Sequence, residues 1–96
     1  MTKAAHTRVH ATLHVPARLG LHARPCTVIA RLVQGSHSHV TIAWQGKSAD
    51  AGSIIELLTL GVPGGATIDV VATGRDADST IRALTRLVEN AGNYDA

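Results

Sequence analysis

Apolar residues change their spacing repeatedly along this chain, and this constrains the fold more than any other feature. Over residues 8–15 apolar and polar side chains alternate strictly, as they do in a half-buried strand. From residue 22 the apolar residues recur at intervals of three and four, which is typical of a helix with one buried face. The alternation returns at residues 39–44, 47–51 and 67–73, and helical patterns follow Ser53 and Asp76. The predicted order is strand, helix, strand, strand, helix, strand, helix.

This order fits one small α+β domain built as a two-layer sandwich, because the apolar faces of strands and helices must be buried against each other. The chain has 96 residues, enough for a single core. An antiparallel sheet can expose its other face to water, and the residues predicted there are polar: Arg8, His10, His14, Thr41, Thr67 and Asp69. We expect the domain to span residues 8–91, with a flexible N-terminal tail at 1–7 and a C-terminal tail at 92–96.

The composition argues against several classes of function. Aromatic residues make up 2% of the chain and the formal net charge is +2 without a basic run, so the stacking platforms and charged stripes of nucleic-acid binders are missing. No stretch approaches the ~18 apolar residues of a membrane span, and the N-terminus lacks the apolar centre of a signal peptide. The single cysteine, Cys26, excludes an internal disulfide and fits a reducing compartment. We therefore expect a soluble, cytoplasmic protein.

One short segment carries the chemistry: Gly20-Leu21-His22-Ala23-Arg24-Pro25. It places a histidine where a helix is predicted to begin, and a helix start attracts anions through its unpaired N–H groups and partial positive charge. A neutral imidazole nitrogen there is a nucleophile for a phosphoryl group, and Arg24 would share the new negative charge. Arg18 on the preceding loop is an additional cation. The spacing alone leaves a second interpretation open, in which His22 only caps the helix beside a solvated arginine.

The segment resembles the active-site signature of HPr, the histidine-containing phosphocarrier of the bacterial sugar phosphotransferase system. The likeness extends over about residues 8–91. It implies an open-faced two-layer sandwich, with a four-stranded antiparallel sheet and three helices on one face. It also implies that His22 is phosphorylated through its Nδ1 atom and that Arg24 contacts the phosphoryl group. The donor would be enzyme I charged by phosphoenolpyruvate, and the acceptor a IIA protein or domain.

On this interpretation the protein is a stoichiometric relay and not an independent enzyme, and it acts as a monomer without a cofactor. Two branches of the system stay open, namely sugar uptake and a nitrogen-related regulatory branch. Pro25 favours the sugar-type signature, because the nitrogen type often has alanine there. Gly52 and Glu56 leave the regulatory branch open. A regulator that binds partners without chemistry is a further alternative, but such a paralogue would be expected to lose His22.

Ser53 is the second candidate site. With Glu56 three residues later it forms the Ser-x-x-Glu pattern of a capping box, which predicts that its hydroxyl caps a helix. In HPr proteins the matching serine is the target of a regulatory ATP-dependent kinase in many bacteria, which would make HPr kinase a further partner. A phosphate at a helix start can be accommodated without unfolding. This chain departs from the family because Gly52 replaces the usual lysine or arginine, which puts the modification in doubt.

The short helix after Ser53 holds more apolar residues than one buried side needs, namely Ile54, Ile55, Leu57 and Leu58. Some of them should face outward as a docking patch for partner proteins, unless the helix is buried on more than one side. The resemblance favours docking, because this helix and the first one bind enzyme I and the IIA acceptors. The predicted partner-binding residues are Thr27, Ile54, Ile55 and Leu58.

The six histidines suggest a different class of function, a small metal-binding module. His10 and His14 lie on one strand face about 13 Å apart, too far to share a metal. His37 and His39 have no cysteine or carboxylate beside them, and the chain has no paired-cysteine motif. Cys26 falls on the apolar stripe of the first helix, so we expect it to be packed and not reactive. We predict no metal site.

Overall fold

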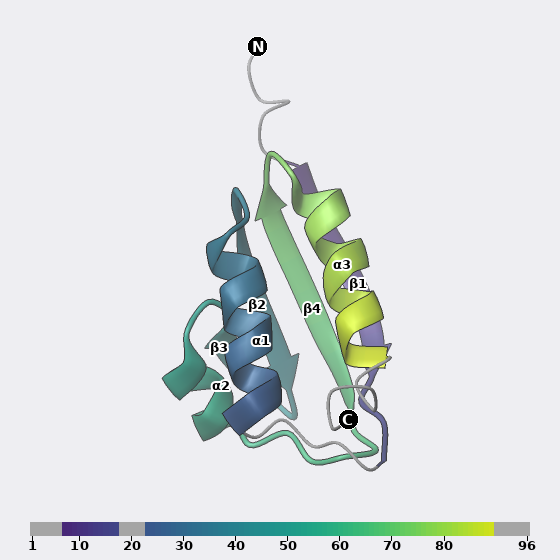
Figure 1. Cartoon of the computed structure of the whole chain (residues 1–96). Coiled ribbons are helices and arrows are strands. Elements are labelled where there is room, and N and C mark those ends of the chain that lie inside the picture. Colours follow the sequence, from purple (N-terminus) through teal and green to yellow (C-terminus); the bar gives the residue numbers. More distant parts are fainter. Residues whose placement is uncertain (1–6, 18–22, 90–96) are drawn as a thin grey trace.

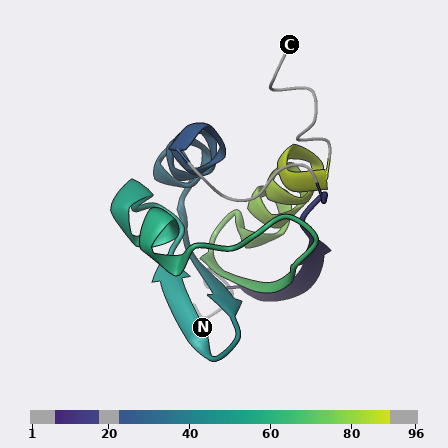
Figure 2. The same cartoon turned by 90° about the horizontal axis from the view of Figure 1, so that it is seen from below.

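The computed structural model describes residues 7–17 and 23–89, and within them it confirms the predicted order of elements. The elements are β1 (Thr7–His14), α1 (Ala23–Gln34), β2 (Ser38–Trp44), β3 (Lys47–Asp50), α2 (Ile54–Leu60), β4 (Thr67–Gly74) and α3 (Ala77–Glu89). The four strands form one antiparallel sheet in the order β1-β4-β2-β3. Figure 1 shows the three helices in front of the strands, and Figure 2 shows that all three cover the same face. The open-faced sandwich is thus confirmed.

Strand β4 lies in the interior of the sheet and joins its two halves. It pairs with β1 along its whole length, from Thr7 opposite Gly74 to His14 opposite Thr67. On its other side it pairs with β2, which in turn forms a hairpin with β3. Gln45 and Gly46 connect that hairpin with positive φ angles of 50° and 78°. Left-handed backbone at both central positions matches the twist of the paired strands.

The core between sheet and helices is aliphatic, as the scarcity of aromatic residues requires. Its largest fully buried side chains come from every layer, and they include Ile29 of α1, Ile42 of β2, Leu57 of α2, Ile68 of β4 and Leu84 of α3. Close packing of these branched side chains removes apolar surface from water, which is the main stabilising contribution.

The open face of the sheet is polar, as predicted. There the Nε2 atom of His10 lies 3.3 Å from Oδ1 of Asp69, and the hydroxyl of Thr12 donates to the same oxygen at 3.0 Å. These groups are well exposed, so their interactions contribute little to stability. Their main effect is to keep this face compatible with water.

At the end of the molecule where β4 finishes, Asp76 connects two segments far apart in the sequence. Its carboxylate accepts hydrogen bonds from the Ser38 hydroxyl, from the His37 backbone N–H at 3.0 and 3.1 Å, and from the Thr80 hydroxyl at 3.2 Å. The hydrogen bond from Ser38, followed by that from His37, lowers the pKa of Asp76 below its usual 3.8. The sequence predicts Asp76 as the N-cap of α3. In the structure its carboxylate accepts mainly from His37 and Ser38, at the start of β2.

Several predicted strand boundaries differ from the structure by one residue; β2 begins at Ser38 and β4 ends at Gly74, each one residue beyond the prediction. Strand β1 begins at Thr7, within the predicted N-terminal tail, and ends at His14. Strand β3 ends at Asp50, although the backbone N–H of Ala51 still donates to Val40. The other residues of the two predicted tails lie outside the described residues.

Candidate functional site

The first turn of α1 holds the described part of the signature. The helix begins at Ala23, Arg24 is exposed and Pro25 is buried in the first turn, where a missing N–H is not needed for helix hydrogen bonding. No acidic residue lies in this turn to compete with a bound anion. His22 and Arg18 lie outside the described residues, so the structure shows the helix end that His22 precedes and not the imidazole.

Cys26 lies on the buried side of this turn, as predicted. It is fully buried in the core, and burial raises the pKa of its thiol to about 11. A thiol with so high a pKa holds very little thiolate near neutral pH, and the thiolate is the reactive form. Cys26 therefore supports the helix start by packing and supplies no competing nucleophile.

The chain entering the signature is held by the turn before β4. The backbone N–H of Val15 donates to the carbonyl oxygen of Ala66 at 2.8 Å. The N–H of Gly65 in turn donates to the carbonyl oxygen of Val15 at 2.9 Å. Gly64 lies so close to this chain that an added Cβ would overlap Ala17, with its carbonyl carbon only 2.8 Å away. Val15 is fully buried. The last described residues before the signature are therefore anchored to the core.

The entrance to α2 confirms the capping role of Ser53 and changes that of Glu56. Ser53 has an extended backbone, and its hydroxyl accepts from the Glu56 N–H at 3.2 Å. In a capping box the glutamate would return to the serine N–H. Here Oε1 of Glu56 accepts from the Asp50 N–H at 2.9 Å, while the Ser53 N–H donates to the Asp50 carbonyl at 3.0 Å.

Two further residues hold this entrance, and the sequence prediction missed both. Asp50 accepts from the Gly52 N–H at 2.9 Å, and Gln34 at the end of α1 donates from Nε2 to the Gly52 carbonyl at 2.8 Å. The Asp-x-Gly spacing is a signal for such a turn, because aspartate bonds readily to the backbone two residues on. The contact from Gln34 depends on how α1 and α2 pack. Ser53 itself is half-buried, and its phosphorylation stays a prediction.

Helix α2 leaves apolar side chains in contact with water. Two large hydrophobic side chains are exposed among the described residues: Ile55, with 73% of its surface accessible, and Leu58, with 42%. Leu57 and Leu60 are buried on the opposite side, which anchors the helix. Of the other predicted partner-binding residues, Thr27 and Ile54 are half-buried. We call Ile55 and Leu58 the α2 patch; it confirms that part of this helix faces outward.

The α2 patch lies beside the helix that carries the signature. Figures 1 and 2 both show α2 next to α1, and the start of α1 points to the same end of the molecule as α2. A partner that reached the start of α1 could therefore also cover the α2 patch.

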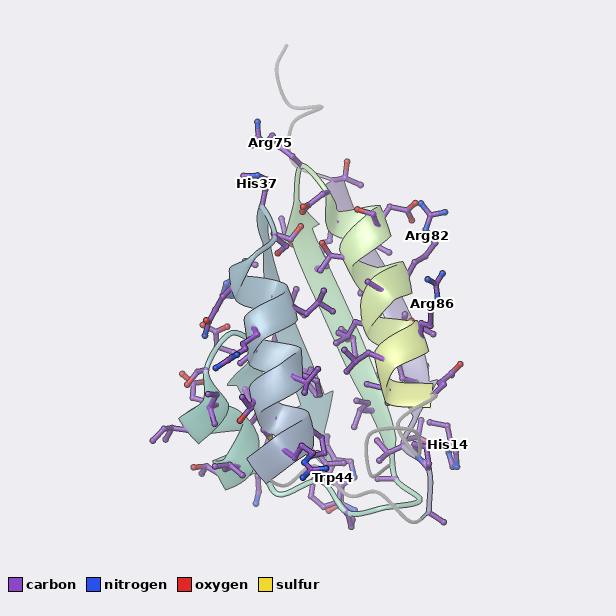
Figure 3. All side chains as sticks on the ribbon, viewed as in Figure 1. His14, His37, Trp44, Arg75, Arg82 and Arg86 are labelled. Atoms are coloured by element: carbon purple, nitrogen blue, oxygen red, sulfur yellow. The ribbon has the colours of Figure 1, made fainter. Side chains whose placement is uncertain are left out.

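Beyond the signature, the structure describes His10, His14, His37 and His39. No group of three or more metal-ligating side chains occurs among the described residues. His14 lies at the end of β1, and His37 lies beside Arg75 at the opposite end of the molecule (Figure 3). No helix within the described ranges is long and apolar enough to span a membrane.

Comparison with known proteins decides the family. Residues 9–90 match the family model described as the PTS HPr component phosphorylation site. The chain belongs to the HPr family.

Several HPr-family proteins are similar along most of their length. The phosphocarrier protein NPr of Shewanella violacea is 35% identical over 83 residues, which cover 86% of this chain and 91% of that protein. The crystal structure of HPr from Bacillus anthracis superposes with a TM-score of 0.81 at 28% identity, covering 85% of this chain and 98% of that chain. The catabolite repression containing protein Crh of Bacillus subtilis gives 0.70 at 30% identity, over 74% of this chain and 82% of its own.

These HPr-family relatives identify the chain as a phosphocarrier-type component of the phosphotransferase system. The structure of Crh is described as a swapped, intertwined dimer. Our expectation of a monomer stays a prediction.

Proposed function

We propose that His22 accepts a phosphoryl group from phospho-enzyme I through Nδ1 and passes it to a IIA protein or domain. The observation that carries this proposal is the position of the signature in a chain of the HPr family. It leads directly into a helix start with an exposed arginine and no acidic residue in the first turn. The protein would work as a monomeric relay in the cytoplasm.

The transfer needs few groups, because phosphoryl transfer depends mainly on positioning and electrostatic stabilisation. The Nδ1 lone pair of neutral His22 would attack phosphorus in line with the bond to the donor. The new P–N bond forms as the donor bond breaks, and the donor retains that electron pair. Arg24 and the partial positive charge at the start of α1 would stabilise the charge on the phosphoryl oxygens. The same steps in reverse order deliver the group to the acceptor.

The test is incubation with enzyme I and labelled phosphoenolpyruvate. We expect one acid-labile, base-stable phosphate, absent from His22→Ala and formed more slowly in Arg24→Ala. His37→Ala and Arg75→Ala are matched controls, because both residues lie at the opposite end of the molecule (Figure 3). Label that persists in His22→Ala would overturn the proposal.

The nitrogen-related branch is a second candidate, and the similarity to NPr of Shewanella violacea favours it. Parallel transfer assays with the sugar-type and nitrogen-type forms of enzyme I and of IIA would distinguish the branches. The pair giving the higher kcat/KM identifies the physiological one. Equal kcat/KM values with the sugar-type and the nitrogen-type proteins would show that this protein does not discriminate between the two branches.

Regulatory phosphorylation of Ser53 by HPr kinase is an additional proposal. Its support is the family position of this serine and its location at a helix start, while Gly52 argues against recognition by the kinase. Mass spectrometry after incubation with HPr kinase and ATP should show one phosphate, absent from Ser53→Ala. An unmodified wild-type protein would refute it.

A further inference from the structure

The turn that leads into α2 brings two carboxylates to the same short stretch of chain as Ser53. Oδ1 of Asp50 accepts from the Gly52 N–H at 2.9 Å, and Oε1 of Glu56 accepts from the Asp50 N–H at 2.9 Å. The Ser53 N–H donates to the Asp50 carbonyl at 3.0 Å, and the Ser53 hydroxyl accepts from the Glu56 N–H at 3.2 Å. Both carboxylates are therefore held within the turn that Ser53 closes.

This turn has little freedom to move the two charges away from Ser53. The Gly52 carbonyl accepts from Nε2 of Gln34 at 2.8 Å, so the end of α1 holds the turn from its other side. Asp50 is half-buried, and both its backbone N–H and its side chain are engaged in hydrogen bonds. Carboxylates that are fixed in this way cannot easily relax away from a like charge placed beside them.

Neither carboxylate is neutralised by a nearby cation. The ion pairs among the described residues lie elsewhere, on the open face of the sheet and along α3. Lys47 lines an open hollow together with Glu56, and Arg31 lies in the last turn of α1, but neither of them forms an ion pair within the described part of the chain. A phosphate on Ser53 would therefore meet two negative charges that are not paired.

We propose that Asp50 and Glu56 disfavour phosphorylation of Ser53 by electrostatic repulsion. In that reaction Oγ of Ser53 takes the γ-phosphoryl group of ATP, ADP leaves with the electrons of the broken bond, and the hydroxyl proton passes to a base of the kinase. The product carries a charge of about −1.5 to −2 near neutral pH, and neighbouring carboxylates repel it. The inference rests on the proposed regulation of Ser53 for the reaction rate, but not for the repulsion itself.

The first test places a charge at position 53 without a kinase. Ser53→Asp and Ser53→Asn introduce side chains of nearly the same shape that both serve as N-caps, and they differ by one negative charge. A negative charge at a helix start is ordinarily favourable, so the charged variant would otherwise be at least as stable. Here we expect Ser53→Asp to melt roughly 2–4 °C below Ser53→Asn at pH 7 and low salt, and the difference to shrink at 1 M salt.

Variants that remove only charge identify the source of this difference. Asp50→Asn and Glu56→Gln each keep a side-chain oxygen that can accept the existing hydrogen bond. When both are combined, the difference between Ser53→Asp and Ser53→Asn should vanish or reverse. Glu89→Gln is the matched control, because it removes an exposed carboxylate at the end of α3 and should leave the difference unchanged.

The second test measures phosphorylation of Ser53 by HPr kinase and ATP, followed by mass spectrometry. We expect kcat/KM of the kinase for the combined Asp50→Asn and Glu56→Gln variant to exceed that for the wild type by roughly threefold to tenfold at low salt. Glu89→Gln should be modified at the rate of the wild type. Melting curves of the unmodified proteins establish that each variant is folded.

The outcomes distinguish this inference from the proposed regulation. If the kinase modifies no variant but Ser53→Asp melts below Ser53→Asn only while Asp50 and Glu56 are present, the regulation fails and the inference stands. If Ser53→Asp is as stable as Ser53→Asn, or more stable, the inference is wrong whatever the kinase does. Equal phosphorylation rates for the wild type and the combined variant would also overturn it, and neither result bears on the labelling of His22.

Discussion

Helices α2 and α3 lie on the same face of one sheet but use their apolar residues differently. Helix α3 has 13 residues and buries a regular stripe along its length: Ala77, Thr80, Ile81, Leu84 and Val88. Its exposed side carries the Arg82–Asp78 ion pair, and Figure 3 shows Arg82 on the side of α3 away from α1. Helix α2 has 7 residues, buries Leu57 and Leu60, and exposes Ile55 and Leu58.

The difference shows which apolar residues hold the fold together and which are available for binding. Helix α3 packs on β1 and β4 and needs its apolar stripe to cover them. Helix α2 packs beside α1 and over β3, and it is anchored by the buried Leu57 and Leu60 together with the half-buried Ile54. The exposed side chains of Ile55 and Leu58 contribute little to stability, and we propose that they contact a partner.

The largest expected effect is the loss of Leu84 from the stripe of α3. Leu84→Ala should lower the free energy of unfolding by about 2–5 kcal/mol, because Leu84 is fully buried and the cavity cannot close completely. Urea denaturation followed by circular dichroism would measure it. Leu58→Ala, in the α2 patch, should cost less than about 1 kcal/mol. Equal losses of unfolding free energy in the two variants would show that α2 and α3 do not differ in how their apolar residues stabilise the fold.

The starts of the two helices should differ in their response to pH. Asp76, just before α3, has a lowered pKa, so its contribution to stability is present above its usual pKa of 3.8 and lost as pH falls through the lower folded value. Asp76→Asn should therefore melt below the wild type at pH 7. The two melting curves should converge below about pH 4. A difference that stayed constant to pH 2 would contradict this assignment.

The start of α2 depends on a neutral hydroxyl. Ser53→Ala should lower stability by about 1 kcal/mol, the usual effect of losing an N-cap, and the loss should not vary between pH 3 and pH 7. Ser79→Ala is the control, because Ser79 is exposed and its hydroxyl donates only to the Asp76 carbonyl. A loss at Ser53 no greater than at Ser79 would show that the cap is unimportant.

Replacing Ile55, the more exposed residue of the α2 patch, should leave the fold intact and weaken docking. Ile55→Ser should change the free energy of unfolding by no more than about 0.5 kcal/mol. The KM of enzyme I for this variant should rise. Ile81→Ser on α3 is the contrasting variant, since Ile81 is buried and its replacement should destabilise the fold. An unchanged KM for Ile55→Ser would show that the α2 patch is not part of the surface that binds enzyme I.

The smallest effect concerns the ion pair on α3. Arg82→Gln breaks a contact of 3.0 Å between Arg82 and Asp78, but both side chains are mostly exposed. The expected loss is about 0.3–0.5 kcal/mol at low salt, disappearing at 1 M salt. A loss that persisted at high salt would indicate a packing role for the arginine stem.

The sequence predicted the elements well because their signals are local. Alternation over a strand and the spacing of Cys26, Ile29, Ala30 and Val33 each depend on a few neighbouring residues. The position of β4 inside the sheet depends on pairing between distant segments, which no short pattern specifies. The hydrogen bond from the Ser38 hydroxyl to the Asp76 carboxylate likewise joins residues 38 positions apart, so no local pattern predicts it.

Part of the candidate site was predictable from the sequence, and the rest depends on how the elements pack. The signature, the Ser53 cap and the excess of apolar residues in α2 are visible in the sequence. Which of those residues face water depends on the rotation of α2 against α1, so Ile54 turned out half-buried while Ile55 is exposed. Glu56 bonds to Asp50 because β3 ends beside α2, a tertiary arrangement that the capping pattern does not contain.

The central position of β4 also has a consequence for the order of events during synthesis. Among the described residues, strand β1 pairs only with β4, from Thr7 opposite Gly74 to His14 opposite Thr67. It therefore cannot join the sheet until residues 67–74 have emerged from the ribosome. Until then the β2–β3 hairpin can form, but β1 has no strand to pair with. Contacts between such distant segments slow folding, because the chain between them must be ordered first. Protection of β1 from proteolysis on stalled nascent chains should therefore appear only after β4 emerges, later than protection of the hairpin.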